Sequence, residues 1–173
     1  MIKGARISLR TVREADLGAL YELVSDRSLQ GDHMPLPLRP EPMFRKEFAE
    51  TGFLSDSRGR FLVVDDEDRI LGTLVYFAVN YMDGYEVGYH LFDLASRGKG
   101  VMTEALALLV RYLFATYRIN RLQICTAVDN EASRRLALRG GFTLEGSLRG
   151  YVFAHGQSRD SLVYSLLRDE VTI

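Results

Sequence analysis

A glycine-rich turn, Arg97-Gly98-Lys99-Gly100, lies between a strand-like segment and an amphipathic helical pattern. Glycine lets the backbone approach a ligand closely, and the first N–H groups of a helix have no partner within the helix. The helix dipole also favours negative charge at that end. The pattern predicts an anion site that would accept a pyrophosphate, with a tight turn that binds nothing as the alternative.

The residues of this turn do not match two other known phosphate-binding loops. A dinucleotide fingerprint needs a third glycine where this chain has Thr103, and a Walker A loop needs Gly-Lys followed directly by Ser or Thr. An enzyme that uses the turn for ATP without either motif stays a weaker alternative.

A carboxylate and an imidazole share one face of the segment 84–92. Strand alternation places Glu86, Gly88 and His90 together on that face. Glu86 is therefore a candidate general base for proton transfer. The alternative is an ordinary solvated strand face, because carboxylates are seldom buried.

Other reactive residue types predict no second centre. Cys125 lies in the strand-like segment 121–127, where a buried, unreactive thiol is favoured over a covalent nucleophile because no neighbour in sequence would lower its pKa. His33 and His155 fall in expected loops, and no spacing of His, Cys and carboxylates indicates zinc. We expect no metal.

Hydrophobic periodicity predicts the elements that position these residues. We expect a strand near residue 9, helices at about 13–24, 42–52, 101–117 and 131–139, and strands at 60–64, 70–80, 84–92, 121–127, 143–153 and 158–167. The four prolines all fall within 30–42, which predicts a loop there. Residues 1–173 are expected to form a single α/β domain, with a mixed, mostly antiparallel central sheet flanked by helices.

Composition bounds the class of protein. A chain of 173 residues with 47% hydrophobic and 26% charged residues suits a globular protein with a sizeable core. Its formal net charge of -1 gives no general attraction to nucleic acid or anionic membranes, and we expect neither as a partner. A single cysteine and an opening without an apolar signal segment predict a cytoplasmic protein.

Four ordered segments resemble the GCN5-related N-acetyltransferases (GNAT), and in particular their RimJ/RimL-like branch. Residues 97–102 resemble the family's loop for the pyrophosphate of acetyl-CoA, and 85–89 resemble the Glu-aliphatic-Gly-Tyr strand of that branch. Residues 130–142 are similar to its Asn-x-x-Ser helix ending in Gly-Phe, and 9–16 to its opening strand and helix. The resemblance implies an enzyme that moves an acetyl group from acetyl-CoA to a primary amine, on a protein N-terminus or a small molecule, by direct transfer in a ternary complex.

The same resemblance implies roles for individual residues. Glu86 would be the general base, and Ser133 would donate a proton or hydrogen bond to the leaving sulfur, unless that serine only satisfies the helix backbone. The coenzyme site would comprise Arg97, Gly98, Lys99, Gly100, Val101, Met102 and Asn130. The acceptor site would comprise Asp32, His33, Met34, His90 and Tyr151.

Two positions depart from the wider family. Met102 stands at the second glycine or alanine position of the loop, as is common in this branch, and Ala137 stands where many members have a tyrosine that protonates the thiolate. Because Ala137 cannot act as this acid, an alternative function stays open: a catalytically weak module that binds or senses acyl-CoA and has a protein partner. A homodimer is left open too, and the lack of a dense acidic cluster argues against polycationic acceptors such as polyamines.

Overall fold

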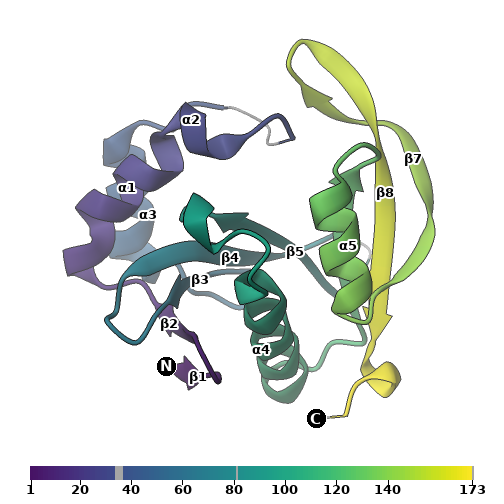
Figure 1. Ribbon diagram of the computed structural model, residues 1–173, viewed down its shortest axis with the longest axis horizontal. Helices are drawn as coiled ribbons and strands as arrows, with labels where there is room; N and C mark the ends of the chain where they lie inside the picture. The colour runs from purple at the N-terminus through teal and green to yellow at the C-terminus, as the bar shows by residue number, and fades with distance from the viewer. Residues whose placement is uncertain (34–36, 81, 173) are drawn as a thin grey trace.

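Antiparallel pairing joins most strands in the computed structural model, which describes residues 1–33, 37–80 and 82–172. Eight strands form one sheet in the order β1-β2-β3-β4-β5-β6-β8-β7, and within the described residues only β5 and β6 pair in parallel. The strands are β1 (Ile2–Lys3), β2 (Ser8–Thr11), β3 (Arg58–Val64), β4 (Ile70–Ala78), β5 (Gly84–Leu91), β6 (Arg121–Ala127), β7 (Thr143–Ala154) and β8 (Gln157–Leu167). The predicted mixed, mostly antiparallel sheet is confirmed (Figure 1).

Helices cover both faces of this sheet (Figure 1). They are α1 (Leu17–Ser25), α2 (Arg27–Gln30), α3 (Glu41–Thr51), α4 (Val101–Thr116) and α5 (Glu131–Arg139). Leu106 and Leu109 of α4 are buried in the larger core cluster, which also contains part of α5. On the other face, Leu20 of α1 and Phe44 of α3 form a second cluster with Leu62 of β3. Among the described residues, no helix combines the length and apolar character needed to cross a membrane.

The predicted boundaries were wrong at the first helices. Pro42 lies in the first turn of α3 and not in the preceding loop, because the first helical N–H groups need no helical acceptor and a proline there loses nothing. The short helix α2 was missed; it begins after Asp26, whose carboxylate accepts the Ser28 N–H at 2.8 Å. One helical turn is too short to leave a hydrophobic period in the sequence.

A buried arginine ties β2 to the start of α1. Arg10 is 4% exposed, donates to both carboxylate oxygens of Asp16 at 2.6 and 2.9 Å, and donates from Nε to Asp68 at 2.6 Å. Full pairing of this kind is what allows a buried charge to be tolerated. The contact fixes the direction in which α1 leaves the sheet.

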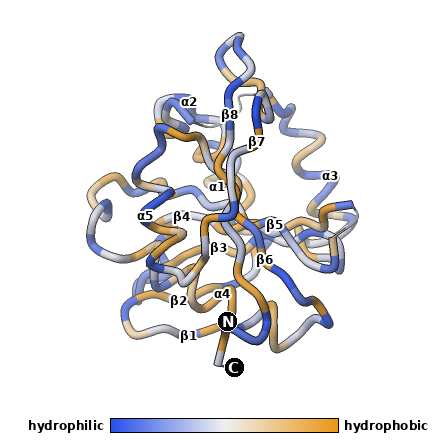
Figure 2. Tube along the Cα trace, turned by 90° about the vertical axis from the view of Figure 1, so that its right-hand side faces the viewer, coloured by the Kyte–Doolittle hydropathy of each residue, from blue (hydrophilic) through white to orange (hydrophobic). Residues whose placement is uncertain are grey.

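The β7–β8 hairpin projects from the sheet at the end opposite both chain termini (Figures 1 and 2). Its turn is made by His155 and Gly156, with φ of 53° and 78°. Two successive positive φ values are typical of the tight turns whose twist matches a hairpin. The two strands are therefore joined by a tight turn, and the hairpin extends beside α5 (Figure 1).

Candidate active site

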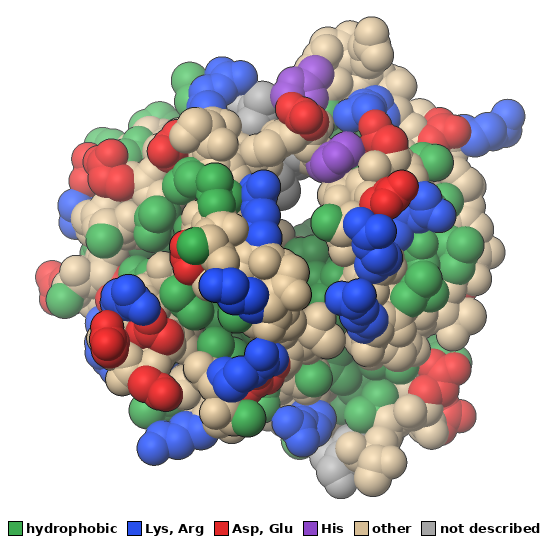
Figure 3. Space-filling view, viewed as in Figure 1, with side chains coloured by type: hydrophobic (Ala, Val, Ile, Leu, Met, Phe, Trp, Pro, Cys, Tyr) green, Lys and Arg blue, Asp and Glu red, His purple; other side chains and the backbone are tan. Residues whose placement is uncertain are grey.

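The parallel strands β5 and β6 separate part-way along the sheet. Their last paired residues are Glu86 and Gln123, and beyond them each strand pairs only with its outer neighbour in the described chain. The separation opens a cleft of about 920 Å³. Figure 3 shows it as a hollow in the middle of this face. Groups from both faces of the sheet therefore meet in one space.

The glycine-rich turn lies at the α4 end of the cleft. Gly98 and Gly100 have φ of 73° and 80°, values that residues with a Cβ rarely adopt. Gly100 is the N-cap of α4 and has no side chain with which to bond the first-turn N–H groups. Gly100, Val101 and Met102 all line the cleft, so the N-terminus of α4 opens onto it. A helix end in this state is suited to binding an anion.

An arginine that the sequence did not single out holds this turn in place. Arg6 donates from Nη1 to the Lys99 carbonyl oxygen at 2.8 Å and from Nε to Glu104 at 3.1 Å. Glu104, in the first turn of α4, also accepts the N–H groups of Ala5 and Arg6 at 2.6 and 2.9 Å. No local pattern could signal this contact, because Arg6 and Lys99 are 93 positions apart.

Glu86 lines the cleft at the point where the strands separate. Gln123 Nε2 donates to Glu86 Oε2 at 3.1 Å and lies 3.3 Å from the sulfur of Cys125. Burial, followed by the nearby Glu86 carboxylate, raises the pKa of the Cys125 thiol to about 12. A thiol that keeps its proton at neutral pH is a poor nucleophile, which supports the predicted unreactive cysteine.

On the opposite face of β5, Tyr89 and Ser133 form a hydroxyl pair. Tyr89 Oη lies 2.6 Å from Ser133 Oγ, and both residues line the cleft. Burial raises the pKa of Tyr89 to about 12, so the phenol keeps its proton at neutral pH. Strand alternation puts Tyr89 on the face opposite Glu86, and no local pattern marks its hydroxyl as functional. Ala137, one turn further along α5, is buried in the core and presents no polar group here.

The cleft brings together most of the residues proposed for the site. Lining it are Asp32, His33, Glu86, His90, Arg97, Gly98, Gly100, Val101, Met102, Asn130, Ser133 and Tyr151. Lys99 is not among the residues that line the cleft, and its carbonyl oxygen accepts a hydrogen bond from Arg6. Met34 lies outside the described residues. Asn130 is also the N-cap of α5, where its Oδ1 accepts the Ser133 N–H at 3.1 Å.

Four residues from distant segments form a strap beside the cleft. Arg159 of β8 donates to Asp129 Oδ2 at 2.6 Å and to the Asp32 carbonyl oxygen at 3.4 Å. His33 Nδ1 lies 3.4 Å from Asp129 Oδ1. The strap, Asp32, His33, Asp129 and Arg159, joins the loop after α2 to the β6–α5 connection and to the hairpin.

His90 of β5 contacts α2, the helix that precedes this loop. Its Nε2 lies 2.7 Å from the Leu29 carbonyl oxygen, and since a carbonyl can only accept, this nitrogen carries the proton. Burial lowers the pKa of His90, and the charges of Arg60 and Arg97 act in the same direction. The imidazole is therefore neutral at pH 7 and tethers the last turn of α2 to β5.

Basic side chains stand on both sides of the hollow (Figure 3). Arg97 comes from the turn, Arg135 and Arg139 from α5, and Arg159 from β8. Guanidinium groups bind phosphate oxygens well, so this charge complements the open end of α4. Within residues 1–33, 37–80 and 82–172, no cluster of three or more His, Cys, Asp or Glu could hold a metal ion.

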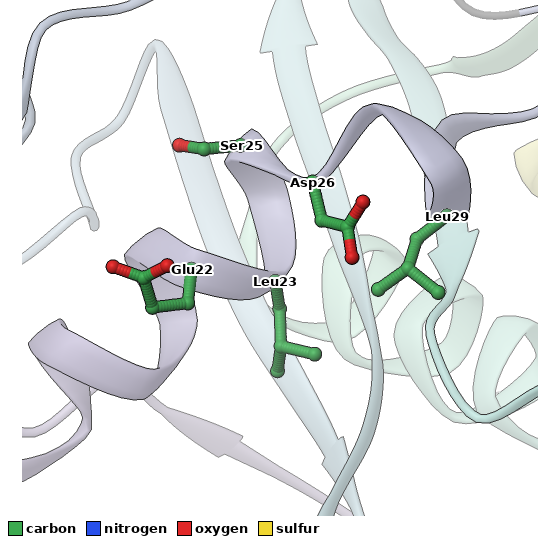
Figure 4. Close-up of a pocket in the computed structure, with 5 residues that line it drawn as sticks. All are labelled: Glu22, Leu23, Ser25, Asp26 and Leu29. Carbon is green, nitrogen blue, oxygen red and sulfur yellow. The ribbon is translucent and has the colours of Figure 1, made fainter.

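A smaller hollow, of about 340 Å³, lies where α1 meets α2 (Figure 4). It is lined by Glu22, Leu23, Ser25, Asp26 and Leu29. The carboxylate of Asp26 is engaged by the N–H and hydroxyl of Ser28 at 2.8 and 2.7 Å. We assign this hollow no chemistry, since its carboxylate already serves as the cap of α2.

A family model described as an acetyltransferase (GNAT) domain matches residues 6–143 of the chain. The chain belongs to the GNAT acetyltransferase family. The matched range contains the glycine-rich turn, β5 and α5, which are the segments that carried the resemblance in sequence. The predicted family is confirmed.

Two relatives carry names that refer to ribosomal acetyltransferases. The ribosomal-protein-serine acetyltransferase of Escherichia coli (strain K12) is 27% identical over 169 residues, covering 94% of this chain and 93% of the relative. The putative ribosomal N-acetyltransferase YdaF of Bacillus subtilis (strain 168) is 40% identical over 85 residues. That alignment covers 49% of this chain and 46% of YdaF, about half the length of each.

Solved structures of other GNAT proteins share the fold. RimL, a ribosomal L7/L12 alpha-N-protein acetyltransferase in complex with coenzyme A, superimposes with a TM-score of 0.84 at 24% identity, covering 98% of this chain and 99% of RimL. The spermidine N-acetyltransferase from Vibrio cholerae, in complex with CoA and spermine, also gives 0.84, at 19% identity with 96% and 98% covered. The predicted GNAT fold is confirmed by these likenesses.

Proposed function

We propose that this GNAT protein is an N-acetyltransferase of the RimJ/RimL-like type, which moves an acetyl group from acetyl-CoA directly to a primary amine bound in the same cleft. One observation carries the proposal. The opening between β5 and β6 has the N-terminus of α4 and the Tyr89–Ser133 pair on one face of the sheet, and the Glu86 carboxylate on the other. Two substrates can therefore meet there from opposite sides.

The α4 side suits the coenzyme. Backbone N–H groups from Gly98 to Met102 would bind the pyrophosphate of acetyl-CoA, with charge added by Arg97. The unpaired edge of β5 would accept the pantetheine arm, and its amides near residues 89–92 would polarise the acetyl carbonyl. Because the Asn130 oxygen caps α5, its amide nitrogen is the group left to donate to the same arm.

Glu86 would accept the proton that the amine loses on attack. A free lysine-type amine has a pKa near 10.4, so only about one molecule in a thousand is unprotonated near neutral pH. The bond from Gln123 fixes the carboxylate at the end of the strand pairing, where it can act directly or through a water. General-base catalysis of this kind contributes about a hundredfold to ten-thousandfold.

Ser133 would serve the leaving group. As the C–N bond forms and the C–S bond breaks, the coenzyme A sulfur gains negative charge and needs a donor. The Ser133 hydroxyl can donate to that sulfur while accepting from the Tyr89 hydroxyl 2.6 Å away. The two hydroxyls would form a short relay that takes the place of the tyrosine absent at Ala137.

The acceptor would be the primary amine of a protein N-terminus or of a small molecule. Support for a protein N-terminus comes from the ribosomal acetyltransferases among the relatives. The walls of the acceptor end would be Asp32, His33, His90 and Tyr151, which line the cleft next to the strap. A cytoplasmic setting belongs to the same proposal, since a chain with one cysteine forms no internal disulfide.

A second candidate is a module that binds acyl-CoA and transfers the acyl group slowly or not at all. The observation in its favour is Ala137, which is fully buried and leaves the usual acid position without a polar group. In that case the cleft would bind the coenzyme and report its presence to a protein partner.

Thiol release from acetyl-CoA separates these candidates. The purified protein is incubated with acetyl-CoA and a panel of acceptors: peptides with N-terminal serine or alanine, free lysine and spermidine. Release that depends on one acceptor, with a mass gain of one acetyl group on it, supports the transferase. Binding of acetyl-CoA by calorimetry without acceptor-dependent release supports the module, and displacement by ATP but not by coenzyme A would overturn both.

A further inference from the structure

The pairing of β7 with β8 is interrupted beside the cleft. Leu148 pairs with Ser161 and Val152 pairs with Arg159, so β7 has two residues more than β8 between these pairs. The extra length is taken up by residues 149–151, which we call the bulge. Bulges disrupt the ladder locally and re-aim the side chains that they carry.

One side chain closes the bulge. Asp160 Oδ1 accepts the Gly150 N–H at 2.8 Å. Gly150 has a φ of 60°, a left-handed conformation that glycine adopts at no steric cost. A backbone N–H that leaves a strand ladder needs a new acceptor, and here Asp160 supplies it from the opposite strand. The bond therefore determines the path of the bulge.

The bulge in turn brings Tyr151 into the cleft. Tyr151 lines it together with Glu86 and Cys125. Burial raises the pKa of the Tyr151 hydroxyl, and Glu86 and Cys125 raise it further, as expected for a phenol next to a carboxylate and a thiol. Tyr151 is thus the residue of the hairpin that reaches the group proposed as the base.

We propose that Asp160 is a positioning residue of the acceptor site, which holds Tyr151 beside Glu86 by binding the Gly150 N–H. The inference rests on the proposed function, because it assigns a task in amine binding. A positioning role differs from a direct contact between Asp160 and the amine. In a direct contact, the negative charge of Asp160 would matter, and its bond to the Gly150 N–H would not. Among the described residues, the α4 turn has no hydrogen bond to residues 149–151, so we expect the coenzyme end to be unaffected.

Steady-state kinetics with the best acceptor of the amine panel test this division. Asp160→Ala should raise the acceptor KM about threefold to tenfold, the range expected for the loss of one hydrogen bond, with the acetyl-CoA KM unchanged. Asp160→Asn keeps an oxygen for Gly150 and should restore the acceptor KM to within about twofold of the parent. In a Tyr151→Ala background, Asp160→Ala should add less than about twofold, because the two residues act as one unit. An asparagine variant as impaired as the alanine variant, or additive effects in the double variant, would overturn the proposal.

The lone cysteine provides a readout that needs no acceptor. Cys125 is the single cysteine of the chain and lies beside Tyr151, so alkylation by N-ethylmaleimide reports on the bulge. Asp160→Ala and Tyr151→Ala should each speed alkylation about tenfold, and Asp160→Asn should not. Asp160→Glu, which displaces the carboxylate by one methylene, replaces the alanine variant if that one does not fold.

Asp65→Ala is the matched control, because Asp65 Oδ1 accepts the Arg69 N–H at 2.9 Å in the β3–β4 turn away from the cleft. Its alkylation rate should equal that of the parent. Parent-like alkylation in Asp160→Ala would refute the positioning role even if amines are acetylated. Conversely, a protein that acetylates no amine of the panel but shows the expected alkylation pattern would refute the proposed function alone.

Discussion

The two ends of the cleft are built from different kinds of group. At the α4 end, the binding groups are main-chain N–H groups of one local turn, and helix formation itself orients them. At the acceptor end, the walls are side chains from segments far apart in the chain, joined by the strap and by the bond from His90 to Leu29. Side chains can be exchanged one at a time, whereas a helix end cannot. We infer that the coenzyme end can stay constant while the acceptor end changes its specificity.

The largest effect is expected where the two ends meet. Glu86→Gln keeps the size of the side chain and removes the base, so kcat at pH 7 should fall about a hundredfold to a thousandfold. The deficit should shrink as the pH rises toward 10, because more of the amine is then already unprotonated. The pH dependence of kcat for parent and variant measures this.

Acetyl-CoA binding supplies the control for Glu86. Its dissociation constant should be the same in Glu86→Gln as in the parent, because the α4 turn makes no contact with residue 86. A constant deficit across the pH range would remove Glu86 from the role of base and leave it as a structural partner of Gln123.

The second effect tests the hydroxyl relay on the coenzyme side. Ser133→Ala should lower kcat about tenfold to a hundredfold, the usual worth of a hydrogen bond to a developing charge. Tyr89→Phe should lower kcat less, since it removes only the support for Ser133. A double variant no worse than Ser133→Ala would show that the two hydroxyls act in series. Unchanged turnover in Ser133→Ala would mean that the serine only completes the α5 backbone.

Local patterns in the sequence were sufficient for most of the fold and for the glycine-rich turn at the start of α4. Helix α5 has its predicted bounds, because an Asn cap, an apolar stripe and a following Gly-Gly all lie within a dozen residues. The glycine turn was found for the same reason. Its two positive φ values and the helix start that follows are local properties.

The parts that sequence reasoning missed depend on contacts between distant residues. The Tyr89 hydroxyl received no predicted role, because its contact with Ser133, 44 positions away, could not be seen in the sequence. The same holds for Arg6 at the turn and for the strap, in which Arg159 contacts Asp32 across 127 positions. Periodicity reports which face a residue occupies and does not report which residue it will meet.

A third and smaller effect should be confined to the coenzyme end. Arg6→Ala removes the bond to the Lys99 carbonyl and the pair with Glu104, so the glycine turn should lose rigidity. Because Arg6 is well exposed and exposed ion pairs contribute little, we expect the acetyl-CoA KM to rise about threefold to tenfold. The acceptor KM should stay constant. A change in the acceptor KM of equal size would show that the two ends are coupled.

The smallest effect is a pH dependence at the acceptor end. Burial lowers the pKa of His90 in the folded protein, so the stability contributed by the neutral ring is fully present above the free-histidine pKa of about 6.5. Below that value the unfolded state takes up a proton that the folded state resists, and stability falls with pH. His90→Gln can still donate to the Leu29 carbonyl but cannot titrate. From pH 7 to pH 5, the parent should lose more stability than the variant, as measured by the free energy of unfolding at each pH.

The same titration should reach the acceptor and not the coenzyme. Protonated His90 still donates from Nε2 to Leu29, but it places a positive charge in a half-buried position near Arg60 and Arg97. The packing around α2 should therefore loosen, and the acceptor KM of the parent should rise about twofold to fivefold more than that of His90→Gln. His155→Asn, at the hairpin turn, is the matched histidine control, because asparagine tolerates the φ of 53° found there. Its pH dependence should follow the parent. If the acetyl-CoA KM moved with the acceptor KM in the parent alone, the neutral imidazole would be supporting both ends of the cleft, and the division between a backbone-built end and a side-chain-built end would not hold.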